Sequence, residues 1–274
     1  MGNKQETVTV FRRHKIPVNW PMKFLNILMV LWKVGHVGSG LKLTKKVHLI
    51  SQWYNDSNSE RFQENLQAVC TNCQNSYVSK YFLFSNENID LQSECHYGAK
   101  IEIIINDEHS RISMDKIFEF ASQSQFIGEI FIFLNLDIFF DESLAGLIRD
   151  SWLDYSRSYF LSRYETVEKE NSVTQCSEEY IGSHDSIVFR SPLPKLLINR
   201  CQYQLGSWGI ENRIMWEFNY FGIQVRNPCK SIRSWHLHNS KIKNDWMPKV
   251  NNDQYSSVAF PQFKDEDLDD LKNS

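Results

Sequence analysis

The stretch IFIFLNLDIFFDES, from Ile130 to Ser143, combines the most apolar run of the chain with two acids. Asp137 lies in its middle, with Asn135 two residues before it and Asp141 four residues after it. A continuous apolar run is typical of a strand that is buried on both faces, as in a parallel sheet. We therefore predict that this strand ends near its acids, at the edge of the sheet where α/β proteins bind ligands.

Apolar patterns on both sides of this stretch predict strands and helices in alternation. Ahead of it we expect a strand at 45–54, a helix capped by Asp56, Ser57 or Ser59, strands at 77–86 and 99–107, and a helix at 112–125. After it we expect strands at 158–165 and 183–192, a short helix at 193–205, and a helix from about Glu211 to Gly222. The apolar runs are continuous, which indicates an α/β fold with a mostly parallel central sheet and helices on both faces.

Composition and charge divide the chain into three predicted parts. The 274 residues are 42% hydrophobic, which supports a substantial core. Residues 1–46 carry nine Lys and Arg against one acid, whereas the remaining 228 residues carry 21 basic and 32 acidic residues. We predict a basic N-terminal segment at 1–45, an α/β domain at 46–245, and a polar, acidic C-terminal tail at 246–274.

The N-terminal segment contains an apolar run from Phe24 to Trp32 that is too short to cross a bilayer. No small-residue cleavage site follows it at a convincing distance, so we expect neither a transmembrane helix nor a signal peptide. Basic flanks and tryptophans around an apolar helix could lie in an anionic membrane interface. A helix packed on the main domain fits the same residues, so peripheral membrane contact stays open.

Six cysteines at irregular spacings do not suggest a disulfide framework, which favours a reducing compartment and a cytoplasmic location. Cys70 and Cys73 form a CTNC pair that Cys95 and His96 could complete as a zinc site, but no second CxxC follows. The first predicted strand is not followed by GxGxxG, and the chain has no P-loop motif. We expect no nucleic-acid partner.

Three short motifs carry residues that could do chemistry. NLDIFFD places Asp137 at a strand end, and WGIENR delivers Glu211 to the first turn of a helix. In SWHLHNS, His236 and His238 alternate on a predicted strand and therefore point the same way. A carboxylate and an imidazole that converge suit Mn²⁺ or Mg²⁺, which could neutralise a diphosphate leaving group. Glu211 could then act as a base on an incoming hydroxyl.

Each of these residues also has a plainer interpretation. Asp137 could simply cap a turn, and Asp141 could cap a helix that begins at Glu142 or Ser143. Glu211 could be an ordinary N-terminal acid that the helix dipole favours. Alternating histidines on a strand are often hydrogen-bonded structural groups. The joint occurrence of these residues at strand and helix ends is what favours a functional site.

In this order the motifs resemble those of a GT-A-type nucleotide-sugar glycosyltransferase: a nucleotide-binding first strand, a DxD-type motif after the fourth strand, a WGxE-type turn and a late histidine. Among inverting members, WGIENRIMWEFNYFG is similar to the WGGED segment of β-1,4-galactosyltransferases, whose acids serve acceptor binding and base catalysis. The likeness runs from Lys46 to Ser240 through short motifs. Asn135 departs from it at the first acid of DxD, and Asn212 departs from it at the second acid of WGGED.

The resemblance implies a GT-A-like, Rossmann-like catalytic domain that moves a sugar from a nucleotide diphosphate sugar to a hydroxyl of a glycan or lipid-linked acceptor. The implied reaction is metal-dependent and inverting. Asp137 would meet the metal and the diphosphate, and Glu211 would deprotonate the acceptor. His236 or His238 would complete the shell of Mn²⁺ or Mg²⁺.

Further contacts are implied around the donor and the acceptor. They are Gln52, Asn55, Arg61, Asn135 and Asp137 with the nucleotide sugar, Arg163 with the donor sugar or the acceptor, and Asp185 with the acceptor as a second candidate catalytic residue. Arg61 could equally be a solvated helix residue, and Asp185 could be part of an exposed turn.

Two other functions are compatible with the same residues. A metal-dependent hydrolase or phosphotransferase would use Asp137, Asp141 and the histidines on a phosphoester, and would release phosphate without an acceptor. A catalytically silent GT-A-like domain that binds a glycan or a partner protein is the second, because Asn135 could weaken metal binding. Binding of nucleotide sugars that is weak or insensitive to Mn²⁺ would indicate this second alternative.

Overall fold

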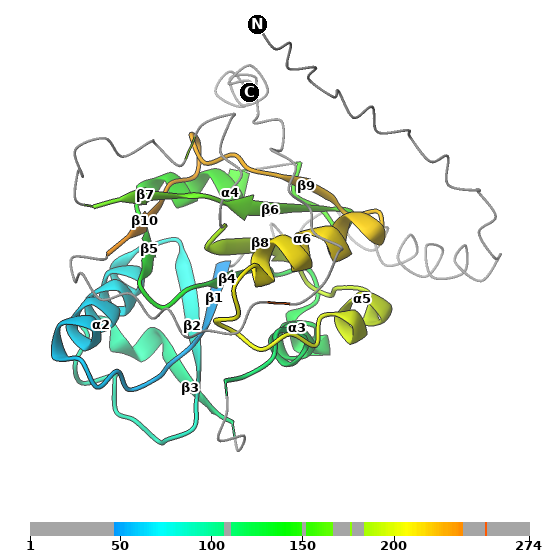
Figure 1. The fold of residues 1–274 in the computed structure, drawn as a ribbon. Helices are drawn as coiled ribbons and strands as arrows, with labels where there is room; N and C mark the ends of the chain where they lie inside the picture. The colour runs from blue at the N-terminus through cyan, green and yellow to red at the C-terminus, as the bar shows by residue number, and fades with distance from the viewer. Residues whose placement is uncertain are drawn as a thin grey trace, which may run out of the picture. The chain divides into compact units, whose positions relative to one another are not determined.

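The computed structural model describes residues 47–106, 111–149, 152–166, 176, 184–237 and 250, within one compact unit that spans residues 45–274. Among these residues the centre of the fold is a seven-stranded sheet with the order β3-β2-β1-β4-β8-β6-β9 (Figure 1). The predictions for residues 1–45 lie outside the described residues, as do those for 246–274 except at Val250.

The central sheet is mostly parallel, as predicted. Its strands are β1 (Val47–Gln52), β2 (Val78–Ser85), β3 (Ile101–Ile105), β4 (Ile130–Leu134), β6 (Arg157–Leu161), β8 (Ser186–Arg190) and β9 (Gln224–Arg226). Strands β1 to β4 pair in parallel, and so do β6 and β9, whereas β8 runs antiparallel to both β4 and β6. The carboxyl ends of β1 and β4 therefore share an edge with the start of β8.

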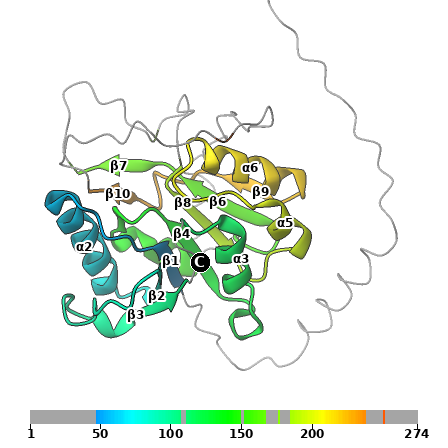
Figure 2. The same cartoon turned by 60° about the horizontal axis from the view of Figure 1, so that its bottom comes forward.

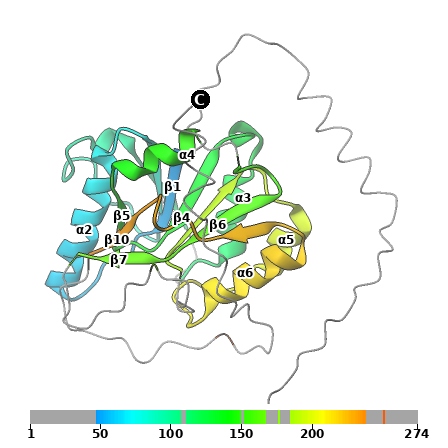
Figure 3. The same ribbon diagram turned by 90° about the horizontal axis from the view of Figure 1, so that it is seen from above.

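Helices cover both faces of this sheet, which confirms the predicted α/β class. Helix α2 (Ser59–Gln74) lies on one face, and α3 (Met114–Ala121), α5 (Lys195–Arg200) and α6 (Ile210–Tyr220) lie on the other (Figures 2 and 3). Alternate residues of one strand serve the two faces: Leu49 packs into the core that includes α2, and Ile50 packs into the core under α3, α5 and α6. This explains why the strands are apolar without alternation.

A second, smaller sheet corrects two of the predicted strands. Among the described residues it contains β5 (Ile138–Phe140), β10 (Ser234–His236) and β7 (Arg163–Glu165), in that order. The opening stretch is thus two strands, β4 and β5, and the predicted strand 158–165 is split into β6 and β7. Both chain segments leave the central sheet, turn through Asn135–Asp137 or Ser162, and enter the smaller sheet. Asn135 and Asp137 of the first turn, and Arg163 just after Ser162, line the site described below.

Caps and turns define the ends of the remaining elements. The side chain of Asn58, rather than the predicted residues, caps α2 by accepting a hydrogen bond from the backbone N–H of Arg61. Asp141 caps the 3-10 helix Glu142–Leu144, which leads into α4 (Ala145–Arg149), so its plainer interpretation is confirmed. Two further 3-10 turns span Gly98–Lys100 and Ser124–Phe126. Gly209 begins α6 with a φ of 81°, a conformation that favours glycine.

The structure corrects the prediction that the cysteines do not form disulfides. Cys70 pairs with Cys95, and Cys176 pairs with Cys229. Cys73 is a buried free thiol, so the CTNC pair cannot act as the predicted alternative, a zinc site. Disulfides form and persist in oxidising compartments, and irregular spacing alone did not exclude them. In the described part of the chain, no helix is long and apolar enough to span a membrane.

Candidate active site

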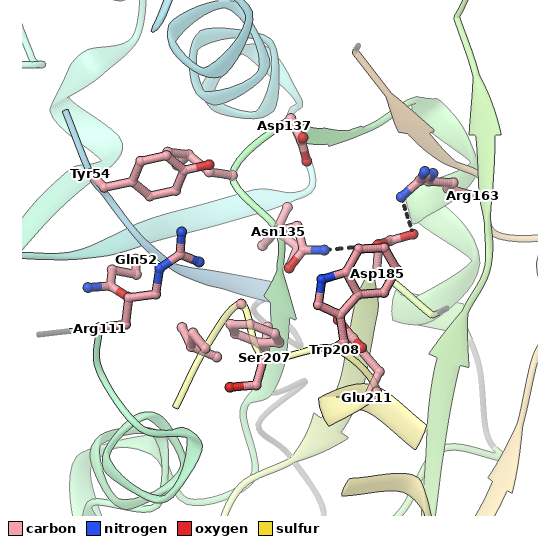
Figure 4. Close-up of a pocket in the computed structure, with 16 residues that line it drawn as sticks. Gln52, Tyr54, Arg111, Asn135, Asp137, Arg163, Asp185, Ser207, Trp208 and Glu211 are labelled. Carbon is pink, nitrogen blue, oxygen red and sulfur yellow. Dashed lines mark hydrogen bonds and ion pairs between the residues drawn. The ribbon is translucent and has the colours of Figure 1, made fainter. Parts of the chain in front are cut away.

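A cavity of about 420 Å³ opens where β1 and β4 end and where β7 and β8 begin (Figure 4). Ligands of open α/β sheets bind at this edge, outside the carboxyl ends of the parallel strands. The polar side chains on its wall come from six separate segments of the chain. They are Gln52, Tyr54, Arg111, Asn135, Asp137, Arg163, Asp185, Ser207, Trp208 and Glu211.

The structure brings most of the predicted site residues to this cavity. Gln52, Asn135, Asp137, Arg163, Asp185 and Glu211 line it. Arg61 and His236 are not among the lining residues, but both contact the carboxylate of Asp137. Asn55 is exposed and does not line the cavity, and His238 lies outside the described residues.

Other residues of the site were not predicted. Glu165 had a signal, because it follows Arg163 by two residues on one strand and therefore points to the same side. Tyr54 follows Gln52 by two residues at the end of β1. Trp208 is the first residue of the WGIENR motif but was not itself predicted as a site residue, whereas Arg111 had no recognisable signal, since it lies in a loop that only the fold brings to the cavity.

Asp137 is the centre of a charged cluster. Its Oδ2 atom accepts a hydrogen bond from Nη2 of Arg61 at 3.1 Å and lies 3.2 Å from Nε2 of His236. The other ring nitrogen of His236, Nδ1, lies 2.8 Å from Oε2 of Glu165. Burial opposes ionisation of Asp137, yet His236 and Arg61 hold its pKa well below the usual range.

The same contacts shift the pKa values of His236 and Glu165. Burial alone would lower the pKa of His236, but the hydrogen bonds with Asp137 and Glu165 outweigh burial and raise this pKa to about 9. Burial likewise opposes ionisation of Glu165, whereas His236 and Arg163 lower its pKa to about 2. The cluster therefore holds alternating negative and positive charges at neutral pH.

Asp185 lies at the centre of a second set of contacts. It is only 2% exposed, and its Oδ2 accepts a hydrogen bond from Arg163 at 2.9 Å. Its Oδ1 accepts a hydrogen bond from the side-chain amide of Asn135 at 2.9 Å, and its backbone carbonyl accepts one from the backbone N–H of Asn135 at 3.0 Å. Arg163 also donates to Glu165 at 3.0 Å, which links the two sets of contacts.

Glu211 stands on the opposite wall, in the first turn of α6. It follows the turn Gly206–Gly209, whose two glycines both have positive φ values, and this turn also places Trp208 at the rim of the cavity with 58% of its surface exposed. Burial, together with the negative charge of Asp185, raises the pKa of Glu211 to about 8. A carboxylate whose pKa lies near neutrality can exchange a proton with a bound hydroxyl.

The far end of the cavity is formed by Gln52, Tyr54 and Arg111 (Figure 4). The guanidinium of Arg111 stacks on the ring of Tyr54, 5.5 Å from its centroid. The side-chain oxygen of Gln52 accepts a hydrogen bond from the backbone N–H of Ile112 at 3.2 Å, so its amide group is left to donate. This end of the cavity therefore offers hydrogen-bond donors, one of them a guanidinium held over an aromatic ring.

The spacing of Asp137 and His236 would suit two ligands of a divalent ion, provided that the ring of His236 gives up the proton that the two carboxylates stabilise. Adjacent ligands of an octahedral ion, each about 2.1 Å from it, lie roughly 3 Å apart, and the two side-chain atoms here are separated by 3.2 Å. Glu165 holds the far nitrogen of the ring, as carboxylates commonly do behind metal-binding histidines. In the part of the chain that the structure describes, no group of three or more His, Cys, Asp or Glu residues could hold a metal. Further ligands would have to come from a bound diphosphate and water.

Three solved structures that are similar to this chain are described here and in the next paragraph. No protein-family model matches the chain, and no curated protein matches it. A mannosyltransferase, PcManGT from Pyrobaculum calidifontis in complex with GDP-Man and Mn²⁺, is similar with a TM-score of 0.46 and 11% identity over 80% of this chain and 66% of that one. S. aureus TarS in complex with UDP-GlcNAc is similar with a TM-score of 0.43 and 10% identity over 82% and 64% of the two chains.

The third is 4-diphosphocytidyl-2C-methyl-D-erythritol synthase from Anaerococcus prevotii DSM 20548, with a TM-score of 0.42 and 10% identity over 67% of this chain and 86% of that one. The chain thus spans 66% of the mannosyltransferase and 64% of TarS.

Proposed function

We propose that this chain is a glycosyltransferase that moves a sugar from a nucleotide diphosphate sugar to a hydroxyl of a glycan or lipid-linked acceptor, with inversion. The observation that carries the proposal is Glu211, a carboxylate with a pKa of about 8 on the wall of a cavity that Asp137 also lines, with Arg61 and His236 in contact with Asp137 behind the wall. The part of the cavity beside Asp137 can bind a diphosphate, while Glu211 accepts a proton. The remaining parts of the cavity fit the other portions of such a donor.

The nucleoside would occupy the end formed by Gln52, Tyr54 and Arg111. Gln52 and Arg111, whose guanidinium lies over the ring of Tyr54, can donate to acceptor atoms on the edge of a base. Donors match bases that carry oxo groups, such as uracil and guanine, better than they match the amino groups of cytosine and adenine. We therefore expect a UDP- or GDP-linked donor.

The diphosphate would lie between the two ends, beside Asp137 and Asn135. Asp137 and His236 would hold Mn²⁺ or Mg²⁺ there, and the ion would neutralise charge on the departing diphosphate. Glu165 would orient the ring of His236 through the 2.8 Å contact at Nδ1. Arg163, fixed between Asp185 and Glu165, would place a cation near the donor sugar.

The transfer step would use Glu211 as the general base. Its carboxylate takes the proton of the acceptor hydroxyl while the hydroxyl oxygen bonds to the anomeric carbon and the bond from that carbon to the diphosphate breaks. A single displacement of this kind inverts the configuration of the sugar. Asp185, held by Asn135 and Arg163, would contact the acceptor and raise the proton affinity of Glu211.

We propose that the protein functions in an oxidising compartment, because Cys70–Cys95 and Cys176–Cys229 are disulfides. Without reductant, the denatured chain should then expose two reactive thiols rather than six.

For residues 1–45 we propose peripheral contact with anionic membranes, and deletion of these residues should abolish adsorption to anionic liposomes. Equal adsorption of the shortened chain would contradict this.

Thermal stability tests the donor site directly. The melting temperature would be measured with UDP, GDP, CDP, ADP and their sugar conjugates, with and without Mn²⁺. We expect UDP or GDP to raise it more than CDP or ADP, and Mn²⁺ to increase the effect. If no nucleotide stabilises the protein under either condition, the chain is not a nucleotide-sugar enzyme.

A further inference from the structure

We propose that Arg61 competes with the metal ion for Asp137 and thereby makes metal loading depend on the nucleotide diphosphate. This inference rests on the proposed function, because it assumes that Asp137 and His236 hold the ion. Arg61 lies outside the motif that carries Asp137, so its role cannot be inferred from that motif alone. Arg61 would act as a positioning residue: its contact with Asp137 would weaken metal binding until a nucleotide diphosphate binds and releases that contact.

The competition follows from the contacts of a single oxygen atom. Oδ2 of Asp137 lies 3.1 Å from Nη2 of Arg61 and 3.2 Å from Nε2 of His236. A metal ion between Asp137 and His236 would approach the same oxygen that the guanidinium contacts. All three side chains are largely buried, with 15%, 13% and 7% of the side chains of Arg61, Asp137 and His236 exposed. Solvent therefore screens their charges only weakly.

Arg61 is also held in place from a second side. It lies in the first turn of α2, where its backbone N–H is bound by the cap residue Asn58. Its Nη1 atom donates to Oε2 of Glu64 at 3.2 Å, and the side chain of Glu64 is only 8% exposed. The guanidinium thus has an anchor that does not involve Asp137, and it can give up the contact with Asp137 without losing all its partners.

Charge then sets the order of events. A divalent cation beside a fixed guanidinium in a weakly screened site is repelled strongly, since the repulsion scales with the product of the charges. A bound diphosphate adds negative charge that both cations can share, and it gives the guanidinium a new partner in place of Asp137. Binding of the diphosphate should therefore favour metal binding, and by linkage metal should favour diphosphate binding by the same factor.

Isothermal titration with Mn²⁺ tests this in the full chain, without an enzymatic assay. In the wild-type protein we expect Mn²⁺ to bind at least ten-fold more tightly when UDP or GDP is saturating than when no nucleotide is present. In Arg61→Met, Mn²⁺ should bind at least ten-fold more tightly than in the wild type without nucleotide, and the gain on adding nucleotide should shrink. Unchanged Mn²⁺ affinity of nucleotide-free Arg61→Met would overturn the proposal.

Two further variants separate charge from packing. Arg61→Lys keeps a cation and should bind Mn²⁺ as weakly as the wild type without nucleotide. Arg157→Met removes an arginine that is paired with Asp154 at 3.4 Å and that does not line the cavity, so it should leave both affinities unchanged. If Arg61→Lys gained Mn²⁺ affinity as Arg61→Met does, the effect would come from packing and the proposal would fail.

The outcomes also distinguish this inference from the proposed function. If UDP and GDP stabilise the protein but Mn²⁺ binds equally well with and without them, the donor site stands and the coupling is refuted. If the nucleotides stabilise the protein and Mn²⁺ binds to neither the wild type nor Arg61→Met, the competition is refuted while a metal-independent transferase is retained. Absence of any nucleotide effect refutes the proposed function itself.

Discussion

Asp137 and Glu211 are carboxylates on two walls of one cavity, and their surroundings move their pKa values in opposite directions. At Asp137, burial is outweighed by the ring of His236 and by the guanidinium of Arg61, so the group stays ionised. At Glu211, burial and the charge of Asp185 outweigh a backbone hydrogen bond and the charge of Arg163, so the pKa rises to about 8. The difference lies in how closely each acid contacts a cation.

This contrast assigns different tasks to two residues of the same chemical type. A carboxylate that stays ionised can hold cations throughout a reaction, whereas one that titrates near neutrality can accept and return a proton. Both acids came from short motifs of the sequence, but only their surroundings distinguish them. The predictions below test that distinction, beginning with the largest expected effect, on sugar transfer, and continuing with metal binding and stability.

Replacing Glu211 should have the largest consequence. Glu211→Gln keeps the size of the side chain but removes the base, so transfer should slow by about a thousand-fold, while the nucleotide still raises the melting temperature as in the wild type. Sugar transfer from the stabilising donor would be followed by mass spectrometry of the product. Asn219→Ala, at an exposed position of α6 that does not line the cavity, is the matched control and should retain transfer. Unchanged turnover of Glu211→Gln would remove this residue from the mechanism.

Replacing Asp137 should affect binding rather than proton transfer. Asp137→Asn removes the charge that His236 and Arg61 share, so the affinity for Mn²⁺ with nucleotide present should fall by about 10- to 100-fold. Titration calorimetry measures this. The control is Asp141→Asn, because Asp141 is bound to Arg233 and Trp235 instead, and this change should leave the Mn²⁺ affinity intact. Equal losses in the two variants would contradict the assignment of Asp137.

Asn135 connects the two walls through Asp185. Asn135→Asp replaces the amide that donates to Oδ1 of Asp185 at 2.9 Å with a second carboxylate. Because a buried hydrogen bond is lost and like charges meet, we expect the free energy of unfolding to fall by about 1–3 kcal/mol at pH 7. Urea unfolding would measure it. The double variant Asn135→Asp/Asp185→Asn restores an amide and a carboxylate, and should recover part of the loss. A double variant no more stable than Asn135→Asp would argue against this contact.

The last prediction concerns the dependence of stability on pH. The pKa of folded Glu211, about 8, lies above its ordinary value of 4.5, so the folded state holds this proton more tightly. The stability that this contributes is complete below about pH 4.5 and is lost as the pH rises through 8. Glu211→Gln removes this dependence, so its melting temperature should fall less than that of the wild type between pH 5 and pH 8.5. Parallel pH curves for the two proteins would show that Glu211 titrates normally.

Much of the fold was predictable because it depends on local patterns. Continuous apolar runs predicted β1 to β4 and a mostly parallel sheet, and helical spacing together with Gly222 predicted α6. The break between β4 and β5 was not predictable, since IFIFL and IFF are equally apolar and only pairing with β10 assigns the second piece to another sheet. The same reason applies to β6 and β7.

The candidate site shows the same division. Asp137, Glu211 and His236 were predicted because each lies at the end of a strand or helix or alternates on a strand. Glu165 and Arg111 were missed, because nothing along the chain pairs Glu165, at the end of a predicted strand, with His236, and because Arg111 lies in a loop. The disulfides were also missed, since spacing along the chain says little about which cysteines approach in space.

By itself, the sequence determined which residues stand at the ends of strands and helices, because periodicity and glycine turns act over a few neighbouring positions. Only the tertiary structure decided which charges meet: Asp137 and His236 are 99 residues apart, and Asn135 and Asp185 are 50 apart. The fold brings these residues into contact, and their contacts set the burial and the nearby charges of each acid. The difference between Asp137 and Glu211 is therefore a property of the folded chain.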